Sequence, residues 1–237
     1  MRPVGFSTGA LAKGDFGRGL ELLRQHQIHA VELSALRLDE LEPLLAALPR
    51  LDLRDFSFVS IHAPTRFALE VEASVIERLH SLADRGYPLV VHPDVIFTPC
   101  LWADLGDRLL LENMDKRKPV GRNVAEMRSM FDSLPAARFC FDIGHARQVD
   151  PTMTEASLLL QTFGDRLTEV HISEVNTASR HDPISSNAVI AFQKVARYIP
   201  EEIPIILEPL IDAGQSDINA EIQRARDALS TLSCVAT

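Results

Sequence analysis

The chemistry-bearing residues of this sequence are a set of histidines and carboxylates, each placed in a short motif of otherwise apolar or small residues. Imidazole and carboxylate groups together are ligands of borderline divalent cations, so the set predicts a site for Zn²⁺ or Mn²⁺, with iron as a further option. Burying so many ionisable groups singly would be costly, which disfavours the alternative of a purely structural polar core. The expected metal ligands are His62, His92, Glu112, Asp142, His145, His171, His181 and Glu208.

All but one of these motifs end an apolar run that predicts a β-strand. The runs end in SIHAP, VVHPD, LLLENMD, FDIGHA, EVHIS and IILEP, and His181 follows in the segment SRHDP. Between the runs, apolar residues recur with the 3.6-residue period that is typical of amphipathic helices. The predicted strands span residues 4–10, 30–34, 58–64, 88–94, 108–115, 138–145, 167–173 and 203–209.

This alternation of strand and helix occurs eight times, at about 30 residues for each unit, which is the size of a minimal βα unit. It predicts the α/β class and a closed (β/α)8 TIM barrel. No linker interrupts residues 1–237, so we expect a single domain. The fourth helical segment, TPCLWADLG, predicts only a turn or two, and Asp15 is the expected cap of the first helix.

In such a barrel the carboxyl ends of the strands form the catalytic face, so the motif residues should converge there. The alternation of side chains along TEVHIS places Glu169 and His171 on one face of the strand and apolar residues on the other. The apolar face should pack on the helices, so His171 should point into the barrel. Glu32, in VELS on the second predicted strand, is expected either as an interior carboxylate or as a substrate contact.

The composition indicates a folded, soluble protein. Apolar residues make up 46% of the chain and charged residues 24%, which are globular values and exclude disorder. With 33 acidic and 24 basic residues the formal charge is -9, which disfavours sequence-independent nucleic-acid binding. The three cysteines form no CxxC pair and indicate reduced thiols. There is no run of about 18 apolar residues and no signal-like start, so we expect a cytoplasmic protein without membrane contact.

The ordered series HAP, VVHP, LEN, DIGH, VHIS and LEP resembles the xylose isomerase-like TIM barrel superfamily, which includes sugar phosphate isomerases and epimerases. Among the branches of that superfamily, the pattern of metal ligands is most similar to endonuclease IV. The resemblance implies that His62, His92 and Glu112 hold one ion and that Glu112 bridges to a second ion. The other implied ligands of the second ion are Asp142, His171 and Glu208.

The resemblance also implies a third ion, held by His145, His181 and an aspartate two residues before that histidine. Here the sequence departs from the pattern, because the residue at that position is Ser179. Asp182, next to His181, is the candidate replacement, and without one the third ion would bind weakly or not at all. We therefore expect two or three divalent ions.

Two reaction types fit these ligands. The resemblance implies that the isomerases and epimerases use one ion, with Glu112 and Glu208 as the acid/base pair. They do not need imidazoles at His62 and His92, so the presence of both favours a multinuclear site. Two ions about 3.5 to 4 Å apart suit phosphoester hydrolysis. A hydrolase is therefore our first expectation and a sugar (phosphate) isomerase or epimerase the alternative, with Glu112, Glu208 and His145 as the catalytic residues.

The substrate is expected to be small and either anionic or sugar-like. The loop DKRKPVGRN follows the fifth predicted strand, and its cations would favour a phosphate, although a solvated turn explains them equally well. The residues expected to bind substrate are Arg66, Lys116, Arg122 and Arg180. No loop rich in arginine and aromatic residues is evident, so abasic-site DNA cleavage is a minor alternative, as is a noncatalytic metal-binding barrel. The helical exterior would allow a homodimer, but no residue marks its face.

Overall fold

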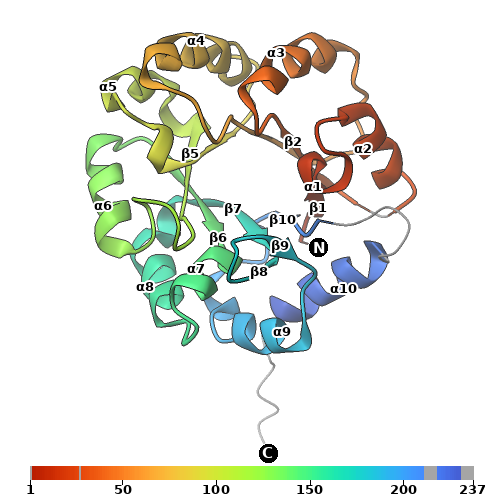
Figure 1. Cartoon of the computed structure of the whole chain (residues 1–237). Helices are drawn as coiled ribbons and strands as arrows, with labels where there is room; N and C mark the ends of the chain where they lie inside the picture. The colour runs from red at the N-terminus through yellow and green to blue at the C-terminus, as the bar shows by residue number, and fades with distance from the viewer. Residues whose placement is uncertain (1, 27, 211–217, 231–237) are drawn as a thin grey trace, which may run out of the picture.

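The computed structural model describes residues 2–26, 28–210 and 218–230. Its centre is a closed barrel of eight parallel strands, and helices surround this ring (Figure 1). The barrel closes because β1 pairs with both β10 and β2. The predicted (β/α)8 barrel is therefore confirmed. Its strands are β1 (Val4–Ser7), β2 (Ala30–Ser34), β3 (Phe58–His62), β4 (Leu89–Val91), β5 (Leu109–Glu112), β6 (Arg138–Asp142), β7 (Leu167–Ile172) and β10 (Ile205–Leu207).

Helices occupy the connections between the strands. The α-helices are α1 (Thr8–Ala12), α2 (Phe16–Leu23), α3 (Leu38–Ala47), α4 (Glu72–Ala83), α5 (Pro99–Trp102), α6 (Val124–Ser133), α7 (Ile143–Val149), α8 (Thr154–Phe163), α9 (Ser186–Gln193) and α10 (Ile218–Ala228). Short 3-10 helices span Leu48–Arg50, Leu69–Val71, Pro93–Val95, Ala103–Arg108, Gly164–Arg166 and Ala196–Tyr198. The prediction of a minimal fourth helix is confirmed by α5, which has 4 residues. Asp15 caps α2 as predicted, since its carboxylate accepts a hydrogen bond from the backbone N–H of Arg18 at 3.0 Å.

Every barrel strand except β2 ends earlier than the sequence pattern predicts, and at β1 and β6 a helix begins directly at the strand end. Residues 8–10 belong to α1 and residues 143–145 belong to α7, so the predicted strand ends were wrong there. At the end of β6, the carboxylate of Asp142 accepts a hydrogen bond from the backbone N–H of His145 at 2.6 Å and caps the helix. The helix packs closely on the end of β7, because a Cβ at Gly144 would lie 2.5 Å from the carbonyl oxygen of Ser173. His145 therefore projects from the first turn of α7.

The main hydrophobic core lies between the barrel and the helices. Phe139 of β6, for example, lies 6.0 Å by ring centroids from both Phe131 of α6 and Phe163 of α8. A smaller buried cluster, formed by Val90, Leu110 and Cys140, is separate from that core. This packing leaves the carboxyl ends of the strands free to carry polar side chains.

A two-stranded antiparallel hairpin interrupts the connection between β7 and α9. It consists of β8 (Glu174–Val175) and β9 (His181–Asp182), and it lies by the mouth of the barrel (Figure 1). The sequence predicted only a loop in this segment. The hairpin brings His181 back toward the strand ends.

Cys100 and Cys140 are free thiols, and Cys234 lies outside the described residues. Among the described helices, none combines the length and the apolar character that crossing a bilayer requires.

Candidate metal centre

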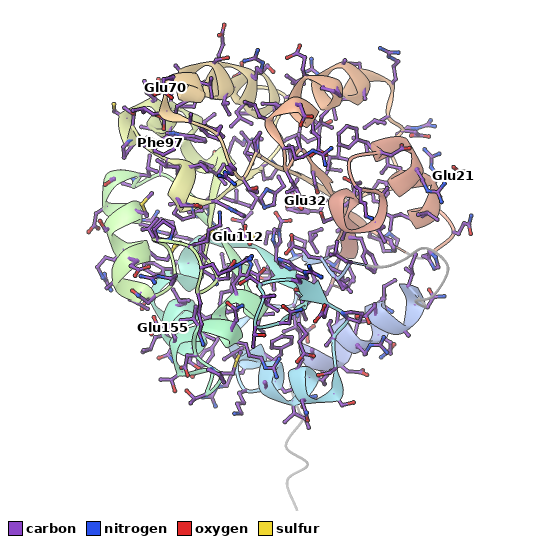
Figure 2. The ribbon with its side chains drawn as sticks, viewed as in Figure 1. Glu21, Glu32, Glu70, Phe97, Glu112 and Glu155 are labelled. Carbon is purple, nitrogen blue, oxygen red and sulfur yellow. The ribbon has the colours of Figure 1, made fainter. Side chains whose placement is uncertain are left out.

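Glu112, the last residue of β5, lies at the centre of a buried polar cluster. Its Oε2 lies 3.3 Å from Nε2 of His62 and 3.1 Å from Nε2 of His92. Its Oε1 lies 3.3 Å from Nδ1 of His145 and 3.5 Å from Nδ1 of His171. Figure 2 shows Glu112 within the ring of strands. A single carboxylate thus faces two separate sets of imidazoles, which is the placement that a bridging ligand needs.

Three groups of ligand atoms gather around this carboxylate, and the atoms of each group lie within 4.8 Å of one another. The groups are His62, His92 and Glu112; Glu112, Asp142, His171 and Glu208; and Asp142, His145 and His181. Glu112 belongs to the first two groups and Asp142 to the last two, so the groups adjoin. The fold therefore brings together all eight residues that the sequence indicated as ligands.

Several buried atoms of the cluster lack a hydrogen-bond partner among the described residues. In the second group these atoms are Oδ2 of Asp142, Nδ1 of His171 and Oε2 of Glu208, and Nδ1 of His92 in the first group is a further one. Leaving such atoms unpaired costs roughly 1–3 kcal/mol each. A divalent cation would satisfy the donor set, because oxygen and imidazole nitrogen are the ligands it prefers. The residues present therefore fit a metal centre.

A hydrogen bond to one imidazole and a carboxylate close to another lie behind the cluster. Nδ1 of His62 donates to the carbonyl oxygen of Ala63 at 2.9 Å, which leaves Nε2 directed at Glu112. Nε2 of His171 lies 3.2 Å from Oε2 of Glu32, while Nδ1 of the same ring faces the cluster. Metal-binding histidines are typically held in this way, with the second nitrogen on a carboxylate or carbonyl group.

Sequence reasoning left the role of Glu32 open and gave Glu169 none. Both carboxylates are fully buried, and Glu169 Oε1 lies 3.5 Å from Nε2 of His171. The hydroxyl of Ser60 donates to the same Glu169 oxygen at 2.8 Å. Glu32 lies inside the barrel (Figure 2), which favours an interior role over a substrate contact. The alternation along TEVHIS was the one signal for Glu169, since it placed that residue on the face of His171.

Burial and mutual charge shift the pKa values of the cluster. Burial tends to raise the pKa of Glu112, but the surrounding imidazoles, His92 first, hold it well below its ordinary value. Burial tends to lower the pKa of His62 and of His145, but neighbouring carboxylates outweigh it and raise these pKa values to about 9 and about 10. Burial raises the pKa of Glu208 to about 8. The cluster therefore attracts protons near neutral pH, and a cation would have to displace them.

The position that departs from the endonuclease IV pattern has a carboxylate beside it. Ser179 Oγ donates to Oδ1 of Asp115 at 2.9 Å and accepts from Nε2 of Gln148 at 2.9 Å. Asp115 follows β5 and is buried. Asp182, the replacement considered from sequence, instead accepts from the side-chain amide of Asn176 at 2.8 Å. Sequence reasoning did not single out Asp115, although LLLENMD ends on it.

A cavity of about 270 Å³ lies over the cluster. Its wall includes ligands from all three groups together with three charged residues of the loop after β5, Asp115, Arg117 and Lys118. We call it the metal cavity. The ligands are therefore within reach of a small molecule.

None of the four residues expected to bind substrate lines the metal cavity. Arg66 and Arg180 are exposed. Arg122 is occupied by Glu126, with the shortest contact at 2.7 Å, because the two residues stand four apart at the start of α6. Lys116 is exposed and lines a neighbouring cavity. The cations at the metal cavity are Arg117 and Lys118, which belong to the same basic loop.

The fold and the site together define a TIM barrel with a candidate metal centre at the carboxyl ends of its strands. Residues 98–232, more than half of the chain, match the family model described as xylose isomerase-like TIM barrel, and the chain belongs to this family. The resemblance inferred from the motifs is thereby confirmed. No match was found among curated proteins.

Several solved structures share the fold. Endonuclease IV from Thermus thermophilus is 18% identical over 94% of this chain and 96% of that one, with a TM-score of 0.59. A xylose isomerase domain protein from Alicyclobacillus acidocaldarius is 16% identical over 97% and 95%, with a TM-score of 0.58. A xylose isomerase-like TIM barrel protein from Mycobacterium smegmatis, in complex with magnesium, is 12% identical over 97% and 98%, with a TM-score of 0.60. At these identities the likeness establishes the fold.

Proposed function

We propose that the protein is a divalent-metal-dependent hydrolase that cleaves a phosphoester of a small sugar or nucleotide. The supporting observation is that Glu112 faces two ligand groups at once, with His62 and His92 on one of its oxygens. A single ion in the second group would not need these two imidazoles. Two divalent ions bound here would activate water and neutralise charge on a phosphoryl group during in-line displacement.

Two cations in the wall of the metal cavity support an anionic substrate. Nζ of Lys118 lies 3.0 and 2.9 Å from the two carboxylate oxygens of Asp94, which fixes the ammonium group in the wall. The guanidinium of Arg117 donates to the carbonyl oxygen of Ser179 at 3.1 Å. Hydrogen bonds from such cations to phosphate are stronger than neutral ones. The two side chains would therefore orient a phosphate above the ligands.

A small substrate is favoured over duplex DNA. The formal charge of -9 opposes binding to a polyanion. The metal cavity, at about 270 Å³, lies near the lower end of small-molecule sites, which start at about 300 Å³. Abasic-site cleavage and a noncatalytic role are therefore minor alternatives.

Metal analysis combined with a hydrolysis assay tests the proposal. Chain purified without chelator is expected to contain two or three equivalents of zinc, manganese or iron and to hydrolyse p-nitrophenyl phosphate until a chelator is added. Glu112→Gln should abolish turnover and lower metal content while the barrel stays folded. His92→Ala should lose about one equivalent of metal and most of the rate, because it removes one candidate ligand of the first group. His29→Ala, which changes an exposed histidine, is the matched control. One equivalent of metal with no phosphate release would contradict the proposal.

A second candidate is a single-metal sugar (phosphate) isomerase or epimerase. The observation in its favour is that the pKa values of two carboxyl groups are shifted in opposite directions. Burial raises the pKa of Glu208 to about 8, whereas the surrounding imidazoles hold the pKa of Glu112 low. Pairs of this kind can divide acid and base roles. The test is exchange of a carbon-bound proton of a sugar phosphate with solvent deuterium. Exchange by His92→Ala at the wild-type rate would favour this candidate over the hydrolase.

A further inference from the structure

We propose that a second cavity, beside the metal cavity, binds a second phosphate group of the same substrate. The inference rests on the proposed function, since it specifies the substrate class of that site. The second cavity measures about 480 Å³, and Arg117 and Ser179 line both cavities. These two residues, joined by a hydrogen bond of 3.1 Å, form the boundary between the cavities, and the proposed substrate would lie across it.

The second cavity collects cations from separate elements. Lys116 and Arg117 come from the loop after β5, and Arg147 comes from α7. No partner of the Lys116 ammonium group is seen within the described residues. The protein as a whole carries a formal charge of -9, whereas three cations line this one cavity, so its charge is locally positive.

The paired cations keep donors for a ligand. Arg147 donates from one terminal nitrogen to Glu174 Oε1 at 2.7 Å, and this ion pair orients the guanidinium without using its full fork of donors. Arg117 Nε lies 3.7 Å from Oδ1 of Asp115. The three cations thus outnumber the two carboxylates that face them, and a bound phosphate would neutralise the remaining positive charge.

Gln148 ties the walls of the cavity together. Its Oε1 accepts from the backbone N–H of Lys116 at 3.0 Å. Its Nε2 donates to the carbonyl oxygen of Asn176 at 2.6 Å and to Ser179 Oγ at 2.9 Å. One side chain on α7 therefore fixes the loop after β5 and the β8–β9 hairpin. A solvated turn would also explain the basic residues, but it would not need these hydrogen bonds. Here they fix the segments that carry the cations relative to one another.

The remaining wall carries one carboxylate, that of Glu174, which is paired with Arg147. The apolar part of this wall, formed by Pro151 and Val175, is suited to the carbon skeleton of a ligand. A substrate with one phosphate over the metal ligands would place its carbon skeleton toward this wall and its second phosphate toward Lys116 and Arg147. The substrate class is thus a small organic molecule with two phosphate groups.

Calorimetric titration of the full, metal-containing chain with inorganic phosphate tests the second cavity. Two classes of phosphate site are expected, one at the metal cavity and one at the second cavity. Lys116→Ala and Arg147→Ala should each weaken the second class about tenfold, as expected for losing a hydrogen bond to a charged group. Arg122→Ala removes the same charge from the same loop but outside both cavities, and it should change neither class. A single class in the wild type, or equal weakening by Arg122→Ala, would overturn the proposal.

A probe with two phosphonate groups tests whether one molecule spans both cavities. Pentane-1,5-diylbisphosphonic acid, whose P–C bonds are not cleaved by a phosphoesterase, should bind the wild type at least about tenfold more tightly than inorganic phosphate, because its second group binds at high effective concentration. In Lys116→Ala this advantage should largely disappear, and an unchanged advantage would overturn the proposal. Both titrations report binding without turnover. A wild type that hydrolyses no phosphoester would therefore count against the proposed function and leave the second cavity open to this test.

Discussion

Ser179 donates a hydrogen bond of 2.9 Å to the carboxylate of Asp115, a residue 64 positions earlier in the chain. The contact lies at the position where the endonuclease IV pattern has an aspartate. Burial tends to raise the pKa of Asp115, but the backbone N–H of Arg117 and the charge of His145 hold it below its ordinary value. A negative charge is therefore already present beside the third ligand group.

Ser179→Asp is expected to leave the metal content unchanged and to lower the melting temperature. The new carboxylate would lie against that of Asp115, and like charges at this distance repel. The backbone at residue 179 has φ of 52°, which aspartate tolerates, so strain would not be the cause. Elemental analysis and thermal unfolding measure the two effects.

The double variant Asp115→Ser with Ser179→Asp moves the charge instead of adding one. It should restore the melting temperature and gain up to one equivalent of metal at the third group. If Ser179→Asp alone gained a full equivalent without loss of stability, the repulsion argued from Asp115 would be wrong.

The fold and the ligand set followed from the sequence because both depend on local pattern. Apolar runs ending in a histidine or carboxylate predict strand ends, and strand ends of a parallel barrel converge on one face. His62, His92 and Glu112 came together for this reason. The early ends of β1 and β6 were missed because a helix begins directly at each strand end. At the end of β6, Asp142 is both the helix cap and a candidate ligand.

The residues that line the cavities depend on contacts that no local pattern encodes. Arg122 and Arg117 lie in one basic loop, yet Arg122 is captured by Glu126 while Arg117 reaches Ser179. Asp115 acquires its role only through the hairpin that carries Ser179. Such placement follows from tertiary packing, which sequence spacing does not specify.

Glu32→Gln is expected to weaken metal binding about 10- to 100-fold, the range found when a group that orients a metal-binding histidine is lost. The carboxylate lies 3.2 Å from Nε2 of His171, and an amide would provide weaker orientation and no charge. Competition with a fluorescent zinc chelator measures the change. Glu21→Gln, an exposed carboxylate on α2, is the control (Figure 2). Unchanged affinity in Glu32→Gln would show that the ring is held without it.

The stability of chelator-treated protein is expected to fall as pH rises from 7 to 10. The pKa values of His62 and His145 are raised to about 9 and about 10 from 6.5, so their contribution is complete below pH 6.5 and is lost through this range. The pKa of Glu208 is raised from 4.5 to about 8, which also removes stability as pH rises through that interval. Urea unfolding at pH 7, 8.5 and 10 measures the trend.

Added Zn²⁺ should flatten this pH dependence, because the cation replaces the protons that the cluster would lose. Stability that stays constant from pH 7 to 10 in the chelator-treated chain would contradict the charge assignment of the cluster.

Glu72→Ala is expected to lower the free energy of unfolding by about 3 kcal/mol. One carboxylate oxygen of Glu72 accepts hydrogen bonds from the backbone N–H of Phe97 at 2.7 Å, from that of Thr98 at 3.0 Å and from the indole of Trp102 at 2.8 Å. These bonds anchor the segment between β4 and α5, and removing the acceptor leaves three donors unpaired. The metal ligands are untouched, so metal content should be retained.

Glu70→Ala provides the comparison, since Glu70 lies two residues away on the exterior (Figure 2) and is exposed. It should change the free energy of unfolding by no more than about 0.5 kcal/mol. Urea unfolding of both variants measures the two changes in the free energy of unfolding. Equal, small effects would mean that water replaces the lost acceptor and that the segment after β4 is held by the packing of Trp102 rather than by Glu72.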